Sequence, residues 1–438
     1  MSYLTYQFRL YPTPAQAAAL DNQLETLRNV YNAALAWWRD AYTYEKAGRG
    51  QVIPRRKKKS GDGFRKLSLQ ETLYPVVSGI RNLHLQAQKN GDPGPHWLAH
   101  VSAVSVRDTI KRVQVAFDHF YRRCNRGVKK KGYPRFKSHE RLRSIPFDNY
   151  GKVCRLYENR LHVFGVGKVV VVRHRDVVGN IKTASVKKDT DGKWYVFLRC
   201  QQEDRVTEKR EGPSVGVDIG LENFLTTSDG EQEPNPKFLK VSLPQLRRLQ
   251  RIASRRMLVA KKQKRKFRES KNLQKAFRDV GKLHVRIRQQ RKEFHHRTAK
   301  SLVDRYATVC VESLNVQGMV RNDKLSRAIG DAGWSGFVTT LKQHAAKAGV
   351  SVVEVDPCGT SQTRPECGGE VRKELKVRVH DCPHCGYKTH RDHAAARVIL
   401  ARGTNGAGRS PVRQNVDPLP EAKADGKVKR AGRNLAIR

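Results

Sequence analysis

Three acidic residues stand at the expected ends or starts of regular elements. Asp218 lies near the end of an apolar run beside Gly220, and Glu312 ends a second apolar run. Asp392 falls in the first turn of an apolar helix. Singly, each acid also fits an ordinary role as a turn former, a strand-end surface group or a helix-dipole partner. Three carboxylates that share one site repel each other, and divalent cations are the usual remedy, so the pattern predicts a metal-dependent site.

The segments around these acids predict an α/β domain, because short apolar strands alternate with amphipathic helices. The order is a strand with Asp, a strand with Glu, and a helix with Asp. The expected strands are residues 215–219, 221–225, 309–312 and 352–355, and the expected helices are residues 325–348 and 391–400.

The charge balance predicts a polyanionic partner. The 438 residues include 87 Lys and Arg against 41 Asp and Glu, for a formal net charge of +46, far beyond what solubility requires. No apolar run approaches the length of a membrane span, and the first residues lack the basic region and apolar core of a secretory signal. We therefore expect a cytoplasmic protein whose eight cysteines are reduced.

The first half of the chain predicts a strand, a set of helices and then a group of strands. Residues 4–10 alternate apolar and polar side chains, as in a strand with one buried face. Thr13, Pro14 and Gln16 fit the capping box that starts a long helix. Further helices are expected at residues 67–88 and 102–121, and strands of a small β-barrel at residues 161–164, 169–172, 181–186 and 194–198.

Two stretches are basic enough to grip phosphates. Residues 122–143 interleave cations with aromatic rings, which suits phosphate contact and base stacking, although a solvated loop would also be basic. Residues 244–304 predict a two-helix hairpin with a basic outer face, although a generic charged helix is the alternative. The candidate nucleic-acid contacts are Lys129, Lys130, Lys131, Tyr133, Arg135, Phe136, Lys137, Arg255, Arg256, Lys261, Lys262, Lys264 and Arg265.

Several motifs resemble those of the TnpB family and its descendants, the compact type V CRISPR effectors. Besides the acidic motifs, they are residues 132–138 (GYPRFKS), 314–319 (LNVQGM), 331–334 (DAGW) and 360–362 (TSQ). The resemblance implies a split RuvC nuclease domain of the RNase H-like fold, in which Asp218, Glu312 and Asp392 bind two Mg²⁺ or Mn²⁺ ions. The family usually has Asn where this chain has Ala394, which could weaken the site without removing a ligand.

The resemblance also implies a domain order. A β-barrel wedge domain would carry an inserted helical recognition lobe, followed by the nuclease domain with a zinc-ribbon insertion. The expected boundaries are residues 1–12 and 126–205 for the barrel, 13–125 for the helical lobe, 206–214 for a linker, 215–356 and 391–403 for the nuclease domain, 357–390 for the ribbon, and 404–438 for a basic disordered tail.

The expected zinc ribbon departs from the family pattern. Cys382 and Cys385 form a zinc knuckle, but only Cys367 remains of its partner, because Arg364 occupies the other position. Cys358 is the nearest spare thiolate and the candidate fourth ligand for one Zn²⁺ ion, and His380 or His384 could substitute, although His384 inside the knuckle is badly placed to share its metal. A ribbon that folds without metal is the alternative.

These features together predict a prokaryotic RNA-guided DNA endonuclease. A bound guide RNA would select complementary double-stranded DNA next to a short adjacent motif, and the acidic site would hydrolyse phosphodiesters. Two alternatives keep the same scaffold: an RNA-guided DNA-binding repressor and a DNA transposase. The sequence leaves open the origin of the guide, the adjacent motif and the oligomeric state.

Overall fold

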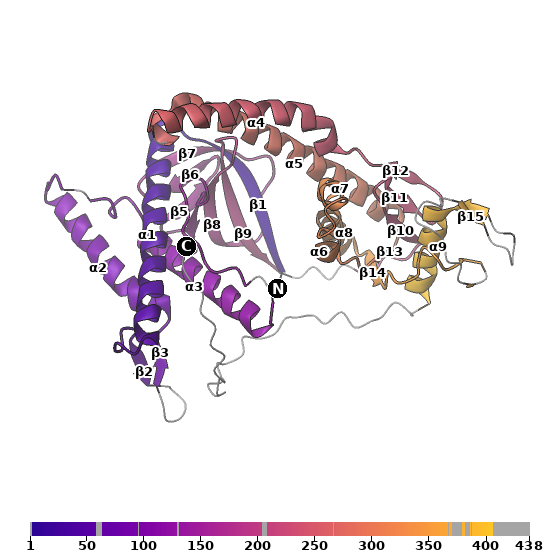
Figure 1. The fold of residues 1–438 in the computed structure, drawn as a ribbon, viewed down its shortest axis with the longest axis horizontal. Helices are drawn as coiled ribbons and strands as arrows, with labels where there is room; N and C mark the ends of the chain where they lie inside the picture. The colour runs from indigo at the N-terminus through magenta and orange to yellow at the C-terminus, as the bar shows by residue number, and fades with distance from the viewer. Residues whose placement is uncertain are drawn as a thin grey trace. The chain divides into compact units, whose positions relative to one another are not determined.

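The computed structural model divides the chain into two compact units (Figure 1). The first comprises Met1–Val206 with Pro244–Arg286, and the second comprises Thr207–Leu243 with Ile287–Arg438. The structure describes residues 2–57, 64–94, 96–128, 131–203, 208–265, 267–366, 368–369, 379–381, 386 and 388–405. Within these ranges no helix is long and apolar enough to cross a membrane.

The first unit is built on a seven-stranded antiparallel sheet that forms a nearly closed barrel (Figure 1). Its strands are β1 (Ser2–Tyr11), β4 (Ser144–Phe147), β5 (Cys154–Tyr157), β6 (Arg160–Val163), β7 (Gly167–Val172), β8 (Asn180–Lys188) and β9 (Trp194–Gln202), in the order β4-β8-β9-β1-β7-β6-β5. β1 pairs with β9 along one edge and with β7 along the other. Tyr6, Phe8 and Leu10 of β1 are buried, which confirms the alternation predicted for this strand.

Three helices accompany the barrel: α1 (Pro14–Lys46), α2 (Leu69–Lys89) and α3 (Ala103–Asn125). α1 begins at the predicted capping box, in which the hydroxyl of Thr13 accepts from the N–H of Gln16 and the Gln16 amide oxygen accepts from the N–H of Thr13. The buried faces of the helices and the barrel share one hydrophobic core. A short hairpin of β2 (Arg55–Lys57) and β3 (Phe64–Lys66) lies between α1 and α2 in the chain.

The second unit contains a five-stranded mixed sheet. Its strands are β10 (Ser214–Ile219), β11 (Asn223–Thr227), β12 (Gln232–Pro234), β13 (Thr308–Glu312) and β14 (Ser351–Val355), in the order β12-β11-β10-β13-β14. β10, β13 and β14 run parallel, whereas β11 and β12 are antiparallel to their neighbours. The nearly continuous burial along β10 and β13 is typical of parallel strands covered on both faces.

Helix α9 (Arg391–Thr404) packs against this sheet with its backbone close to two strands. A Cβ atom on Gly216 of β10 would lie 2.0 Å from the carbonyl oxygen of Ala396, and one on Gly403 would lie 2.2 Å from Sγ of Cys310 in β13. Glycine at both positions permits this approach. The docking fixes the first turn of α9 relative to the ends of β10 and β13.

Two long helices, α4 (Phe238–Lys262) and α5 (Lys271–Arg305), each have one end in each unit, with a short 3₁₀ turn at Phe267–Glu269 between them. The helices thus match the predicted hairpin of residues 244–304. A two-stranded ribbon of β15 (Val379–Asp381) and β16 (Lys388–His390) precedes α9.

The single helix expected over residues 325–348 is wrong. The structure has α7 (Ser326–Ala332) and α8 (Trp334–Ala348), preceded by the short α6 (Val316–Met319). The break falls at Gly333, whose φ of 70° is in the left-handed region that favours glycine. A Cβ atom there would come within 2.9 Å of Cδ of Arg291, so the turn lies tightly against α5.

Candidate active site

Asp218 lies near the end of β10, between the buried residues Val217 and Ile219. The chain then bends at Gly220, whose N–H donates to the carbonyl oxygen of Phe224 at 3.1 Å. The carbonyl oxygen of Gly220 accepts from the indole Nε1 of Trp334 at 3.3 Å. The bend two residues after Asp218 is therefore held by hydrogen bonds to β11 and to α8.

Glu312 ends the neighbouring parallel strand, β13. The register pairs Val217 with Val311, and because parallel strands end at the same edge of a sheet, Asp218 and Glu312 follow at adjacent positions. Glu312 is 9% exposed, and its Oε1 accepts a short hydrogen bond from the hydroxyl of Thr360. The same hydroxyl also contacts the carbonyl oxygen of Pro357 at 3.1 Å, so Thr360 fixes the Glu312 carboxylate to the chain beyond β14.

Asp392 reaches the same region from the first turn of α9, where it is 8% exposed. The N–H of Asp392 donates to Nδ1 of His390, the N-cap residue, at 3.4 Å. Nε of Arg391 lies 3.6 Å from Oδ1 of Asp392. The next residue, His393, donates from Nε2 to the carbonyl oxygen of Ser228 at 3.0 Å, so the start of α9 is attached to the turn after β11.

The charges of Glu312 and Asp392 affect the pKa of Asp218, so the three acids belong to one site. The pKa of Asp218 is raised from 3.8 to about 8, first by burial and then by the charges of Glu312 and Asp392, while Arg391 opposes the shift. Burial also raises the pKa of Glu312, against the hydrogen bond from Thr360 and the charge of Arg402. Burial and the neighbouring charges therefore both favour the protonated form of Asp218 when no cation is bound.

The donor set suits a hard divalent cation, because carboxylate oxygens are the ligands that Mg²⁺ prefers in proteins. In the described part of the chain, no three His, Cys, Asp or Glu side chains already lie close enough together to enclose a metal ion. Asp218 is nonetheless close enough to Glu312 and Asp392 for their charges to raise its pKa.

The sequence did not identify the groups that hold the acids in place. Thr360 belongs to a motif that the sequence analysis quoted, but its bond to Glu312 spans 48 positions along the chain and no local pattern predicts it. Arg391 stands directly before Asp392, so its proximity was readable but its charge effect on Asp218 was not. Ala394, the departure from the family pattern, is fully buried in α9.

The predicted zinc ligands are only partly described. Cys367, Cys382 and Cys385 lie outside the described residues. Cys358 is a free, exposed thiol whose backbone carbonyl accepts from Nη1 of Arg402 at 2.6 Å. Arg364, which replaces the family cysteine, is 1% exposed and therefore part of a packed interior.

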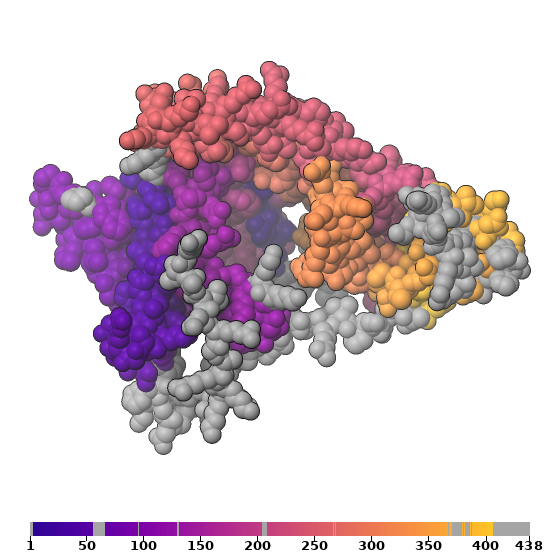
Figure 2. All heavy atoms as spheres, in the orientation of Figure 1, coloured from indigo at the N-terminus to yellow at the C-terminus, as the bar shows by residue number. Residues whose placement is uncertain are grey.

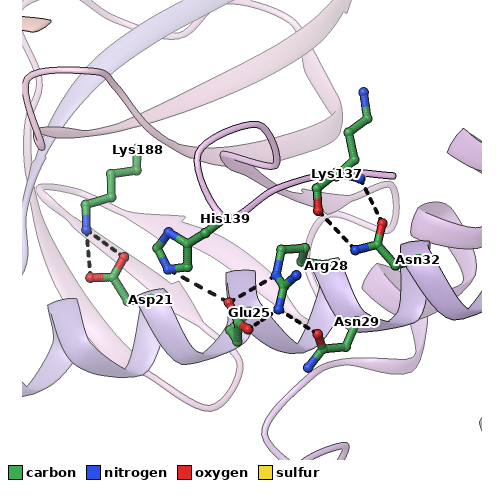
Figure 3. Close-up of polar contacts among 8 residues, drawn as sticks. All are labelled: Asp21, Glu25, Arg28, Asn29, Asn32, Lys137, His139 and Lys188. Carbon is green, nitrogen blue, oxygen red and sulfur yellow. Dashed lines mark hydrogen bonds and ion pairs between the residues drawn. The ribbon is translucent and has the colours of Figure 1, made fainter. Parts of the chain in front are cut away.

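The basic segment of residues 131–137 lies along α1 and α3. Lys137 exchanges two backbone hydrogen bonds with the Asn32 amide of α1, at 2.8 and 3.0 Å (Figure 3). Two residues on, His139 approaches Glu25, which also binds Arg28 (Figure 3). The segment is thus held at a defined place on the helix.

The aromatic rings of this segment are only partly available for bases. Tyr133 packs edge-on against Phe117 and Phe120, and the guanidinium of Arg39 lies 5.4 Å from the ring centre of Phe136. Both rings remain about half exposed, at 44% for Tyr133 and 45% for Phe136. Lys131 and Arg135 are exposed, whereas Lys129 and Lys130 lie outside the described residues.

The predicted nucleic-acid contacts on α4 and just after it are almost all exposed. Figure 2 shows this part of the chain at the surface. Arg255, Lys261, Lys262, Lys264 and Arg265 are exposed. Arg256 differs, because its Nη1 donates to the carbonyl oxygen of Asn272 at 2.8 Å and the side chain is half-buried. Arg256 therefore joins the two helices of the hairpin.

Three family descriptions match successive parts of the chain. A "Helix-turn-helix domain" of IS605 OrfB proteins matches residues 1–47, the IS605 OrfB family, described as "Probable transposase", matches residues 197–323, and "Cas12f1-like, TNB domain" matches residues 334–399. In the structure, residues 1–47 are the strand β1 and the single helix α1.

Individual relatives span most of the chain. The "Putative RNA-guided DNA endonuclease" of Streptomyces pristinaespiralis is 29% identical over 404 residues, which cover 91% of this chain and 89% of the relative. "Putative RNA-guided DNA endonuclease InsQ" of Escherichia coli K12 is 28% identical over 327 residues, which cover 70% and 76%. Among solved structures, the mini-RNA-guided endonuclease CRISPR-Cas phi3 superposes loosely over 92% of each chain, with 9% identity and a TM-score of 0.42.

Proposed function

Because the chain belongs to the TnpB (IS605 OrfB) family, we propose that it is an RNA-guided DNA endonuclease. A bound noncoding RNA selects complementary DNA beside a short adjacent motif, and the protein holds the resulting heteroduplex. The net charge of +46 supports a nucleic-acid partner, because many Lys and Arg side chains are available to neutralise its phosphates.

The observation that carries the proposal is the coupling of three carboxylates from separate elements. Asp218, Glu312 and Asp392 come from β10, β13 and α9, and burial together with the charges of the last two raises the pKa of the first to about 8. Arg391 acts on Asp218 and Arg402 acts on Glu312, and the charge of each opposes the raised pKa only in part. Such a cluster is unfavourable for the fold alone and favourable once cations bind.

These three residues would hold two Mg²⁺ or Mn²⁺ ions. When bound, the ions supply an activated water and stabilise the leaving oxygen in phosphodiester hydrolysis. The chain itself fixes the acids: Thr360 holds one oxygen of Glu312, and the docking of α9 at Gly216 holds the turn that carries Asp392. Arg391, beside Asp392, reduces the repulsion in the metal-free state.

The remaining parts take the roles that the family implies. The barrel of the first unit is the wedge domain with the helices as its recognition lobe, and the second unit contains the RuvC-like nuclease. Lys131, Arg135 and the exposed cations at the end of α4 contact the guide RNA or the heteroduplex, since they are solvent-facing and lie in strongly basic stretches of the sequence. Cys367, Cys382 and Cys385 bind one zinc ion with Cys358 as fourth ligand.

The test begins with the RNA that copurifies with the chain. Sequencing that RNA gives the guide segment, and DNA carrying its complement beside randomised flanks gives the substrate. We expect Mg²⁺-dependent cleavage of the matching DNA only. Asp218→Ala should abolish cleavage and retain guide-dependent DNA binding, because it removes a metal ligand and not a phosphate contact.

Glu233→Ala is the matched control, because Glu233 is a solvent-accessible acid of the same unit, paired with Arg297 at 3.7 Å. Cleavage by Asp218→Ala at the wild-type rate contradicts the site. Binding without cleavage by the wild type identifies an RNA-guided repressor, and joining of the cut ends identifies a transposase.

A further inference from the structure

A cavity of about 390 Å³ in the second unit is lined by one face of α5 and by the turn between α7 and α8. Arg288, Arg291, Lys292 and His295 supply its polar wall. Their spacing of i, i+3, i+4 and i+7 puts all four on one face of the helix. No Asp or Glu is among the described residues that line the cavity.

Asp331, which follows the lining residue Gly330, is already bound by other partners. Its carboxylate accepts the N–H groups of Leu239 and Lys240 at 2.8 and 3.0 Å, which begins helix α4, and it accepts Nη2 of Arg291 at 3.1 Å. Nε of Arg291 also donates to the backbone carbonyl oxygen of Asp331 at 2.5 Å. Arg291 is therefore locked in place, and Asp331 has little capacity left to neutralise the rest of the cavity.

His295 contributes a dipole and not a charge. Its Nε2 donates to the carbonyl oxygen of Ala332 at 2.9 Å, and burial lowers its pKa, so the ring is neutral at physiological pH. Arg288 and Lys292, which also line the cavity, are exposed. The cavity is thus a positively charged hollow whose other walls are apolar residues, glycines and the hydroxyl residues Ser335 and Thr340.

The same cavity touches the candidate active site through Trp334. This ring forms part of the wall, and its indole nitrogen donates to the carbonyl oxygen of Gly220 at 3.3 Å, two residues after Asp218. A group bound in the cavity would contact Trp334, the residue that holds the bend after β10.

We propose that this cavity binds a phosphodiester group of the nucleic acid that the protein holds. The inference rests on the proposed function in that this nucleic acid is the guide RNA or the target DNA. Arginine and lysine on one rigid helix face recognise a phosphate by charge and by directed N–H groups, and a hollow without carboxylates favours an anion over a base edge. The cavity is large enough for a phosphate with part of its sugar.

Gly330 offers a direct way to test the charge of the cavity. It lines the wall within α7, and a Cβ atom added there meets nothing within 4 Å. Gly330→Glu introduces a carboxylate without a backbone clash, and Gly330→Gln introduces the same shape without the charge. We expect the Glu variant to bind nucleic acid about tenfold more weakly than the Gln variant at low salt, with a shallower dependence of log affinity on log salt concentration by about one.

A second pair of variants approaches the site from the cation side. Arg288→Gln with Lys292→Gln removes two cavity charges, and Arg297→Gln with Lys300→Gln removes two exposed charges from α5 residues that do not line the cavity. The first pair should weaken binding several-fold more than the second. Thermal unfolding of each variant checks that the fold is retained.

The probes are the copurified RNA, labelled and titrated by fluorescence anisotropy, and then a matching DNA duplex titrated into the protein–RNA complex. A loss in the first titration assigns the phosphate to the RNA, and a loss confined to the second assigns it to the DNA. Equal binding by the Glu and Gln variants in both titrations overturns the proposal. Because binding is the readout, a protein that binds nucleic acid and never cleaves it refutes the proposed nuclease activity but not the proposed phosphate site.

Discussion

Replacing Asp218 by Asn tests whether the three carboxylates destabilise the metal-free protein. Asn keeps the size and shape of the side chain and removes its ionisable group. In the folded chain, burial and the charges of Glu312 and Asp392 raise the pKa of Asp218 from 3.8 to about 8. In the presence of a chelator, we therefore expect Asp218→Asn to be more stable than the wild type at pH 8.

The sign and size of this effect follow from proton linkage. Because the folded state binds the Asp218 proton more tightly than the unfolded state, the contribution of this group to stability is greatest below about pH 4 and is lost as the pH rises towards 8. A shift of roughly four units at about 1.4 kcal/mol each sets a ceiling of roughly 5 kcal/mol. Relaxation of the acids and entry of water reduce this, and we expect a gain of about 1–3 kcal/mol.

The assay is urea unfolding of both proteins from pH 5 to 9 in chelator, repeated with excess Mg²⁺. The difference should grow with pH in chelator. With Mg²⁺ it should shrink or reverse, because a ligand that binds only the folded wild type stabilises it by mass action. Glu233→Gln, at a solvent-accessible acid, should show neither trend. An Asp218→Asn protein that is less stable than the wild type at pH 8 in chelator refutes the reasoning.

Three further predictions concern the docking of α9, the basic hairpin and the ribbon. Gly216→Ala should cost about 1–3 kcal/mol in urea unfolding, because its Cβ would lie 2.0 Å from the carbonyl oxygen of Ala396, whereas Gly330→Ala, which meets nothing within 4 Å, should cost nothing; equal costs would contradict the close approach. Changing Arg255, Lys261 and Lys262 to Gln should make the salt dependence of RNA binding shallower by about one per lost phosphate contact, and an unchanged slope places the RNA elsewhere. Metal analysis should give roughly one zinc per chain that is lost in both Cys382→Ser and Cys358→Ser, and zinc that persists in Cys358→Ser would exclude that residue as the fourth ligand.

The elements that carry the acids could be predicted because their signals are local. An apolar run that ends in one carboxylate marks the end of a buried strand, and β10 and β13 both follow that pattern. The capping box at Thr13 is equally local, because its two hydrogen bonds join residues three apart.

The break between α7 and α8 could not be predicted from the same kind of signal. An isolated glycine within a helical pattern is usually tolerated, and residues 325–348 suggested one helix although they contain Gly330, Gly333 and Gly336. Packing decides the break. A Cβ atom added to Gly333 would lie 2.9 Å from Cδ of Arg291 on α5, so only glycine fits there. The contact joins residues that are far apart in the sequence.

The basic segment of residues 131–137 shows another limit of composition. Its aromatic rings suggested base stacking, but Tyr133 uses one edge to pack against Phe117 and Phe120 of α3. An aromatic residue among cations suits either an internal helix partner or an external base, and only the fold distinguishes them.

The association of the three acids depends on glycines whose role the sequence did not reveal. Gly216 and Gly403 let α9 lie with its backbone against β10 and β13, and the first turn of that helix then carries Asp392 towards Asp218. A larger residue at either position would clash with the packed backbone or side chain, so glycine is what permits the close approach that places the first turn of α9 near Asp218. The chain combines the close approach of α9 to the sheet with a raised pKa of Asp218. A site that relies on bound cations requires this combination.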